Sequence, residues 1–292
     1  MADSRDEWRL RDRVLYPGRT PLVMGVVNVT PDSFSDGGRF AATEAAVAHG
    51  LELARQGADL LDIGGESSRP GAEPLDLEEE LRRVVPVVRG LATRTDVPLS
   101  VDTYKAETAR QALEAGAHVI NDITALRGDP GMAEVVRGFG AGLVLMHMQG
   151  SPPTMQQNPV YGDVAAEVAD FLEARLRAAA DLGIAGSWVV LDPGVGFGKT
   201  VEHNLELLAR LAELRRLGRP VCLGASRKGF LGKLLGRPVE ERFAGSLTAV
   251  CHALAHGAAQ VFRVHDVAET RDAVRLFEAL RERQPRGGER GA

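Results

Sequence analysis

The feature that most constrains the fold is an eightfold alternation of short apolar runs with helical patterns. The runs are rich in Val, Ile and Leu, and their continuous hydrophobicity is typical of parallel strands buried on both faces. They span residues 21–28, 58–65, 97–102, 117–122, 142–148, 187–192, 220–226 and 259–265. This repeated alternation predicts an α/β fold, a (β/α)8 TIM barrel, with a doubly wound open sheet as the alternative.

The helical patterns between the runs mark where the chain turns back. They occupy residues 42–57, 76–92, 106–116, 162–183, 201–218 and 245–257. Several finish on a glycine, the residue type that closes a helix in a left-handed conformation, namely Gly57, Gly116, Gly183, Gly218 and Gly257. Because no linker divides the chain, we expect an N-terminal extension over residues 1–20 that caps the barrel bottom, one barrel domain over 21–281, and a disordered tail over 282–292.

Composition excludes several classes of protein. The formal net charge is -5 and the basic residues are scattered, which disfavours nucleic-acid binding. No stretch approaches the roughly 18 apolar residues of a membrane span, and the N-terminus has no signal-peptide core. We therefore expect no membrane partner and a cytoplasmic location. Cys222 and Cys251 are expected to be free thiols, as in a reducing compartment.

The stretch LDPGVGFGKT, residues 191–200, is close to a nucleotide-binding loop but does not match it. Pro193 stands where the first glycine of G-x-x-x-x-G-K-[ST] belongs. We expect Lys199 and Thr200 to open the next helix instead. A Ser-His-Asp hydrolase is disfavoured because the chain has no G-x-S-x-G elbow, and zinc because no Cys or His pair has ligand spacing.

Polar residues follow every apolar run. In a TIM barrel the chemistry lies where the strands end, because the following loops converge there. A single Asp or Asn after a strand is more often a helix cap or turn residue, and we assign Thr103, Asp122 and Asp266 to that class. The coincidence at eight strand ends still predicts a site, whose candidates are Asn28, Asp62, Asp102, Asn121, His147, Asp192, Ser226, Arg227, Lys228, Arg263 and His265.

The candidates divide into two chemical groups. Two carboxylates and an asparagine in one mouth suit a flat, neutral heterocycle with several N–H donors. Lys228, Arg263 and His265 follow the last two runs, which lie next to the first run once the barrel closes, so with Asn28 they form a cationic corner suited to phosphate. Asn28 and Asp36 carry oxygen ligands of the kind that Mg²⁺ prefers where it bridges to substrate phosphates.

Eight motifs, in order and spanning residues 24–270, resemble the dihydropteroate synthase family. They are MGVVNVTPDSFSDGG, DIGGESSRPGA, SVDTYK, VINDIT, LMHMQGSPPTMQ, LDPGVGFGK, GASRKGFLG and RVHDVAET. The resemblance implies a transferase of folate biosynthesis that condenses 6-hydroxymethyl-7,8-dihydropterin pyrophosphate with p-aminobenzoate, giving 7,8-dihydropteroate and pyrophosphate. It also implies Mg²⁺ on the phosphate oxygens, sulfonamides as inhibitors, and a homodimer joined through helices at the side of the barrel.

The resemblance also assigns roles to residues. It implies pterin binding by Asp102, Asn121, Asp192 and Lys228, and pyrophosphate binding by Asn28, Arg263 and His265, with the metal at Asn28 and Asp36. The p-aminobenzoate pocket would be formed by Phe34, Ser68, Arg69, Pro70, Phe197 and Gly229, with loops 29–40 and 64–73 closing over it. The residues implied in catalysis are Asn28, Asp102, Lys228, Arg263 and His265. Ionisation at the pterin methylene would precede attack by the arylamine, so no protein nucleophile is required.

Three positions depart from the family pattern. Ser68 stands where many members have Thr, Val195 replaces an aromatic residue, and Gly229 replaces a serine that often helps bind the p-aminobenzoate carboxylate. We expect these changes to affect affinity and sulfonamide sensitivity rather than the reaction. At residue 229 the backbone N–H at a helix start remains available to an anion.

Two other functions compete with this interpretation. One is a pterin-binding methyltransferase barrel that moves a methyl group from methyltetrahydrofolate to a corrinoid protein, and the other is a barrel that binds a pterin without turnover. The first should lack the S-R-K and R-V-H motifs, because it binds no pyrophosphate. The second is disfavoured by intact Asp192, Lys228, Arg263 and His265.

Overall fold

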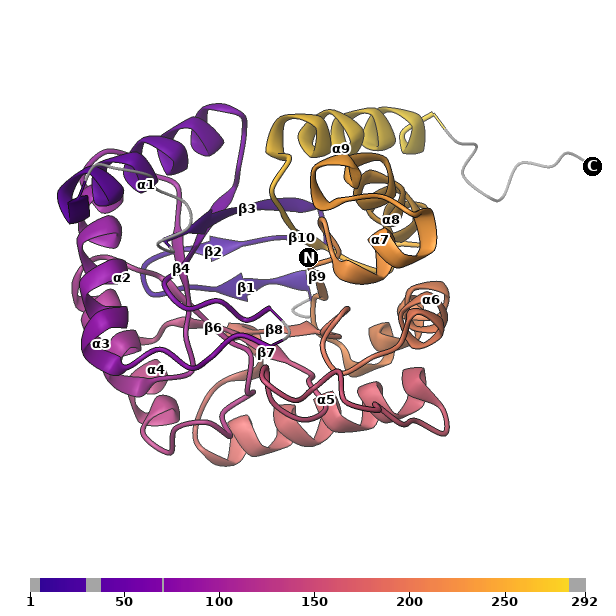
Figure 1. Ribbon diagram of the computed structural model, residues 1–292, viewed down its shortest axis with the longest axis horizontal. Coiled ribbons are helices and arrows are strands. Elements are labelled where there is room, and N and C mark those ends of the chain that lie inside the picture. The colour runs from indigo at the N-terminus through magenta and orange to yellow at the C-terminus, as the bar shows by residue number, and fades with distance from the viewer. Residues whose placement is uncertain (1–5, 30–37, 70, 284–292) are drawn as a thin grey trace, which may run out of the picture.

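Eight parallel strands form the centre of the molecule and helices surround them (Figure 1). The computed structural model describes residues 6–29, 38–69 and 71–283. The strand order is β8, β7, β6, β5, β4, β3, β10, β9, and a parallel bridge between Leu191 and Val221 joins the two outer strands. The predicted TIM barrel is therefore confirmed, and an open doubly wound sheet is ruled out.

Each apolar run contains one strand. The strands are β3 (Leu22–Asn28), β4 (Leu60–Gly64), β5 (Leu99–Asp102), β6 (Val119–Asp122), β7 (Gly142–Met146), β8 (Val189–Asp192), β9 (Cys222–Leu223) and β10 (Val261–Val264). The helices are α1 (Gly38–Arg55), α2 (Leu77–Ala92), α3 (Ala106–Glu114), α4 (Met132–Phe139), α5 (Val164–Asp181), α6 (Val201–Ala209), α7 (Gly229–Leu235), α8 (Phe243–Ala255) and α9 (Val267–Arg281). Short 3-10 turns are η3 (Gly186–Trp188), η4 (Leu211–Leu217) and η5 (Val239–Glu241).

Each predicted helical pattern overlaps a helix, and the closing glycines behave as expected. The five glycines predicted to close helices all have positive φ. The helix predicted over residues 201–218, however, divides into α6 and η4. Leu211, Leu214 and Leu217 recur every three residues and pack against the core, which suits the three-residue period of a 3-10 helix.

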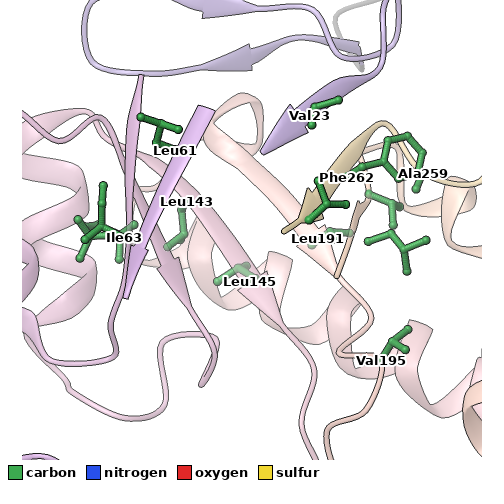
Figure 2. Packing of buried hydrophobic residues seen from close by; sticks show 14 of the residues in the cluster. Val23, Leu61, Ile63, Leu143, Leu145, Leu191, Val195, Ala259 and Phe262 are labelled. Atoms are coloured by element: carbon green, nitrogen blue, oxygen red, sulfur yellow. The ribbon is translucent and has the colours of Figure 1, made fainter. Parts of the chain in front are cut away.

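The core has two layers because successive side chains of a strand point to opposite faces. The outer layer packs the strands against the helices, and Figure 2 shows part of it, including Leu61, Ile63, Leu143 and Phe262. The inner layer fills the barrel with the alternate residues Leu22, Met24, Leu60, Val119, Val144, Val190, Cys222 and Val261. The barrel interior is thus a packed core that ends below its mouth.

A small antiparallel hairpin precedes the barrel. It consists of β1 (Trp8–Arg9) and β2 (Val14–Leu15). Trp8 and Leu10 pack with the inner layer, which includes the first residues of β3, β4, β6 and β10. The Trp8 indole N–H also donates to the Trp188 carbonyl at 2.9 Å. The hairpin therefore lies at the end of the barrel opposite the strand ends that carry the polar residues.

Candidate active site

A ring of polar side chains lies directly above the inner apolar layer. Asp62, Asn121, Asp192 and Arg263 each come two residues after a member of that layer, so they face the same way. Asp62 is in register with Ser100, and Asp102 with Asn121, which brings residues from neighbouring strands together. The strand-end residues predicted from the sequence therefore converge on one mouth.

Arg263 joins two carboxylates from different strands. Its Nε lies 2.6 Å from Asp62 Oδ2, and its Nη2 lies 2.9 Å from Asp102 Oδ2. Asp62 is fully buried and also accepts hydrogen bonds from Ser100 Oγ at 2.6 Å and Asn121 Nδ2 at 3.2 Å. Sequence reasoning placed Asp62 at a strand end without giving it a role. Its contacts make it the countercharge that fixes Arg263, while the Arg263 Nη1 donors stay available to a ligand.

Asn121 presents an unsatisfied acceptor. Its side chain is 4% exposed, and Oδ1 is a buried side-chain atom without a hydrogen-bond partner in the described structure. Such orphan acceptors are rare in folded proteins because the lost hydration is not replaced. A ligand N–H donor at this position would satisfy it.

Burial shifts the ionisation of the groups around the mouth. It raises the pKa of Asp102 to about 7, although the Arg263 charge opposes the shift. It also raises the pKa of Asp192, whose Oδ1 accepts the Gly194 N–H at 2.7 Å. Burial together with the Arg263 charge lowers the pKa of Lys228 to about 8. At neutral pH the mouth thus holds ionisable groups close to their titration points.

Lys228 also contacts the aromatic wall of the mouth. Its Nζ lies 3.9 Å from the centroid of the Phe197 ring, a cation–π contact. Phe197 is 7% exposed and belongs to an apolar cluster with Ile123, Met146, Met148 and Met155. The ring therefore separates the lysine from a largely hydrophobic surface.

Lys199 is buried, which the sequence did not indicate. Thr200 caps α6 as predicted, but Lys199 is 2% exposed and does not open the helix. Its Nζ contacts His147 Nδ1 at 2.9 Å, the Gly194 carbonyl at 2.9 Å and the Phe197 carbonyl at 3.0 Å. Lys199 thus braces the turn that carries Phe197, and His147, whose pKa burial lowers to about 2, is neutral beside it.

His265 is held by Ser226 from the neighbouring strand end. Ser226 Oγ accepts the His265 backbone N–H at 3.2 Å and lies 3.0 Å from His265 Nδ1. Burial and the Arg263 charge lower the pKa of His265 to about 4, so the ring is neutral near pH 7. If Ser226 donates its hydroxyl proton to Nδ1, the His265 Nε2–H is left as a donor. His265 is therefore an uncharged hydrogen-bonding group at this corner, and the positive charge comes from Lys228 and Arg263.

The remaining predicted residues occupy the rim. Asn28 is exposed at the end of β3, which pairs with β10 and so neighbours the strand of Arg263. Ser68 is half-buried and Arg69 exposed in the loop after β4, and Gly229 is the exposed first residue of α7. Phe34, Asp36 and Pro70 lie outside the described residues. Val195, one of the departures, is 1% exposed and packs in the outer layer (Figure 2).

The loop after β4 is anchored by a partly buried ion-pair network that the sequence analysis missed. Lys105 Nζ lies 2.5 Å from Glu66 Oε2 and 2.7 Å from Glu80 Oε2, and Tyr104 donates to Glu66 Oε1 at 2.8 Å. Glu66 precedes the predicted p-aminobenzoate residues of this loop by two to four positions. Nothing local in the sequence pairs Glu66 with Lys105, since 39 positions separate them.

A cavity of about 420 Å³ opens between the loops after β4, β5, β6 and β7. This volume lies within the range of small-molecule pockets. Its walls include Tyr104, Ile123, Met148, Pro152 and Pro153, of which Ile123 and Met148 also belong to the Phe197 cluster. Glu66 and Arg127 add charge to the same walls, so the cavity is mixed in character and adjoins the Phe197 cluster.

The described residues offer no preformed metal cage. Within residues 6–29, 38–69 and 71–283, no three His, Cys, Asp or Glu side chains gather as a metal site. Asn28 provides one exposed amide oxygen beside the cationic corner. That donor set fits Mg²⁺ that takes its other ligands from a diphosphate and water, which is how this ion usually binds.

Comparison with known proteins gives a consistent result. Residues 24–265 match the profile of the family described as pterin binding enzyme. The dihydropteroate synthase of Escherichia coli K12 is 48% identical over 259 residues, covering 89% of this chain and 91% of the relative. A Yersinia pestis dihydropteroate synthase in a sulfonamide drug complex superposes with a TM-score of 0.88 at 45% identity, covering 94% and 99% of the two chains. A Xanthomonas albilineans dihydropteroate synthase with 4-aminobenzoic acid gives a TM-score of 0.87 at 51% identity, covering 94% and 98%.

Within the described part of the chain, no helix combines the length and the apolar character that crossing a lipid bilayer requires.

Proposed function

The chain belongs to the dihydropteroate synthases of the pterin-binding enzyme family, transferases that join a dihydropterin pyrophosphate to p-aminobenzoate, and we propose that two sides of its mouth bind the two parts of the first substrate. One side holds the pterin and the other holds the departing pyrophosphate. The observation that carries this proposal is the convergence of the orphan acceptor on Asn121, the carboxylates Asp102 and Asp192, and the cations Lys228 and Arg263.

The pterin side consists of acceptors that match the N–H donors of the ring. Asp192 accepts two parallel N–H bonds from the guanidine-like edge, as a carboxylate can. Asn121 Oδ1, which lacks another partner, accepts a third. Asp102 accepts a further N–H, and Lys228 donates to the polar ring atoms on the opposite edge.

The pyrophosphate side supplies positive charge and donors. As the bond between the pterin methylene carbon and the bridging oxygen breaks, its electron pair leaves with the pyrophosphate. Arg263, Lys228 and the neutral His265 ring meet that growing charge, which is usually the largest contribution to catalysis. The arylamine nitrogen then bonds to the methylene carbon and loses a proton to water. Because Asp62 and Asp102 already hold Arg263 in place, it needs no reorganisation during this step.

We propose Mg²⁺ as the cofactor, with Asn28 as a ligand and Asp36 as a second. When bound, the ion neutralises charge on the pyrophosphate oxygens. Asn28 ends β3, the strand that pairs with the strand of Arg263.

The p-aminobenzoate pocket, which adjoins these two sides, is formed by Phe197, Ser68, Arg69 and Gly229, together with Phe34 and Pro70. Phe197 provides the flat apolar wall, and Lys199 fixes its turn. The Yersinia pestis relative carries a sulfonamide drug. We propose that sulfonamides occupy the same pocket in this chain, because they present an aryl amine of similar shape.

Binding affinities measured by calorimetry distinguish the two sides of the mouth. We expect Asn121→Ala to weaken both 6-hydroxymethyl-dihydropterin and its pyrophosphate ester by about 10-fold, since a buried hydrogen bond is lost. His265→Ala should weaken only the ester. Equal effects of His265→Ala on both ligands would contradict the division.

We also propose a homodimer in a reducing, cytoplasmic compartment. Exposed apolar side chains gather on the adjoining elements α6, α7, η5 and the start of α8, namely Leu205, Leu234, Leu235, Val239 and Phe243. Such a surface supports association between copies of the chain. Both cysteines are free, Cys222 buried and Cys251 exposed, which supports the compartment.

A further inference from the structure

The backbone ladder between β9 and β10 ends before it reaches the site. Only Cys222 and Leu223 of β9 pair with β10, opposite Val261 and Phe262. Lys228 and His265 lie beyond this short ladder. Their relative position must therefore be set by side chains and turns rather than by sheet hydrogen bonds.

Two side-chain links continue where the ladder stops. Ser226 Oγ contacts His265 Nδ1 at 3.0 Å, as described above. One residue further on, the Arg227 guanidinium binds the Asp266 carboxylate with two nitrogens, Nη2 to Oδ1 and Nε to Oδ2, the latter at 3.3 Å. A two-point arginine–carboxylate contact fixes orientation as well as distance. Arg227 directly precedes Lys228, and Asp266 directly follows His265.

The backbone of Arg227 is strained and held from both sides. Its φ is 56°, in the left-handed region that costs a non-glycine residue roughly 1–2 kcal/mol. The Arg227 N–H donates to Ser246 Oγ at 2.9 Å, and its carbonyl accepts from Arg242 Nη1 at 3.2 Å. Strain of this kind persists where the surroundings enforce it, and it concentrates at functional sites. Here it directs the chain so that Lys228 reaches Phe197.

Asp266 does not act as the helix cap that its position predicts. It lies at the N-cap of α9, yet its side chain makes no cap hydrogen bond. Thr103 and Asp122, which we assigned to the same class, do bond to nearby backbone N–H groups at Lys105, Thr124 and Leu126. The Asp266 carboxylate instead faces Arg227, and it is 17% exposed.

We propose that Arg227 and Asp266 are positioning residues that hold Lys228 and His265 at a fixed separation for the departure of pyrophosphate. We call this pair the clasp. The inference rests on the proposed function of Lys228 and His265. Because misplacing a catalytic group by about 1 Å can cost about 100-fold in rate, a contact that sets their separation has a measurable effect on turnover.

The test uses Asp266→Asn and Arg227→Asn in the full chain. Asparagine adopts positive φ readily, so Arg227→Asn removes the ion pair without adding backbone strain. We expect kcat/KM for the pterin pyrophosphate to fall about 10- to 100-fold. The KM for p-aminobenzoate and the Kd of the pyrophosphate-free pterin should change by a much smaller factor than kcat/KM, because His265 contacts neither ligand and Lys228 supplies only one of several contacts to the pterin.

Three further variants sharpen the test. The double variant should be no worse than the poorer single variant, since both break one contact. Arg227→Lys should recover part of the activity by restoring one charged contact. Glu44→Gln breaks a comparable two-point pair between Arg94 and Glu44 away from the mouth, at 3.0 and 3.4 Å, and should leave kcat/KM unchanged.

Several outcomes would overturn the clasp. Asp266→Asn and Arg227→Asn with kcat/KM within twofold of the parent would do so. Parallel losses of pterin affinity, p-aminobenzoate KM and thermal midpoint would also overturn it, because they indicate a purely structural role. Lys228→Ala and His265→Ala, measured in the same assay, show whether the proposed function or only the clasp is wrong. If these two retain full turnover, the proposed function itself fails, whereas if they lose it and the clasp variants do not, only the clasp is wrong.

Discussion

At the residue scale, an acidic and a basic side chain with shifted pKa values lie in the same buried mouth. Asp102 has its pKa raised to about 7 by burial, and Lys228 has its pKa lowered to about 8. The two values lie close together although the groups titrate far apart in water. The charge state of the mouth is therefore sensitive to pH within the physiological range.

The pH dependence of turnover follows from these two groups. The kcat/KM for the pterin pyrophosphate should rise with pH through about 7, as Asp102 loses its proton and becomes an acceptor, and fall above about 8, as Lys228 loses its charge. Lys228→Arg should remove the alkaline limb, because arginine keeps its proton, and Asp102→Asn should remove the acid limb. A profile that is flat from pH 6 to 9 in the parent protein would contradict this assignment.

Replacing Gly229 by serine should raise the affinity for p-aminobenzoate. A side-chain carbon at this position would meet no heavy atom within 4 Å. Gly229→Ser therefore adds a hydroxyl donor near the expected p-aminobenzoate carboxylate without a clash. We expect the KM for p-aminobenzoate and the inhibition constant of a sulfonamide to fall about 2- to 10-fold, as one added hydrogen bond allows. Unchanged values for both would place the carboxylate away from Gly229.

Single residues also show where sequence reasoning reaches its limit. Asp102, Asn121, Asp192, Lys228, Arg263 and His265 were identifiable because each lies at or just after the end of an apolar run. Lys199 was not, because its burial depends on acceptors from residues 147, 194 and 197 that come together only in the fold. Asp266 resembled a cap locally, and only its long-range partner Arg227 distinguishes it.

At the element scale, the backbone is most tightly constrained in the turn between β8 and α6. Gly194 has φ of 64°, and a Cβ there would lie 1.8 Å from the His147 carbonyl oxygen. Its N–H donates a hydrogen bond to Asp192 Oδ1, and its carbonyl accepts one from Lys199 Nζ. The glycines of this turn therefore allow two strand-end segments to approach within backbone contact.

Substitution of Gly194 tests this turn. Gly194→Ala should lower the free energy of unfolding by more than about 2 kcal/mol and reduce turnover, because the left-handed backbone and the clash both oppose it. Gly138 in α4 is the matched control, since a Cβ there meets nothing within 4 Å. Gly138→Ala should stabilise by up to about 1 kcal/mol. Thermal and urea unfolding measure both, and a Gly194→Ala protein as stable as the parent would contradict the geometry.

The sequence predicted the elements better than their lengths. All eight apolar runs contain a strand, because burial on both faces leaves a continuous hydrophobic signal. The apolar run at 220–226 nevertheless forms a strand of only two residues, and the chain then turns at Ser226 and Arg227 just before Lys228. Where function shapes the backbone, the apolar pattern overestimates the regular structure.

At the scale of the whole molecule, the apolar surface over α6, α7, η5 and the start of α8 predicts association. Light scattering should give about twice the chain mass of 31.2 kDa. Leu235→Glu on α7 should shift the protein toward monomer, because it places a charge in the apolar contact. Leu182→Glu, at a position equally exposed at 46% but at the end of α5, should not. A dimer that persists in Leu235→Glu and dissociates in Leu182→Glu would place the interface elsewhere.

The central claim is that this barrel condenses a dihydropterin pyrophosphate with p-aminobenzoate through its cationic corner. The most direct measurement is pyrophosphate release with Mg²⁺, with and without p-aminobenzoate, for the parent, Lys228→Ala and the exposed control Lys233→Ala. We predict release that requires p-aminobenzoate, matches dihydropteroate formation one to one, falls about 100-fold or more in Lys228→Ala, and is unchanged in Lys233→Ala. Tight pterin binding without p-aminobenzoate-dependent release, or full activity in Lys228→Ala, would contradict the account.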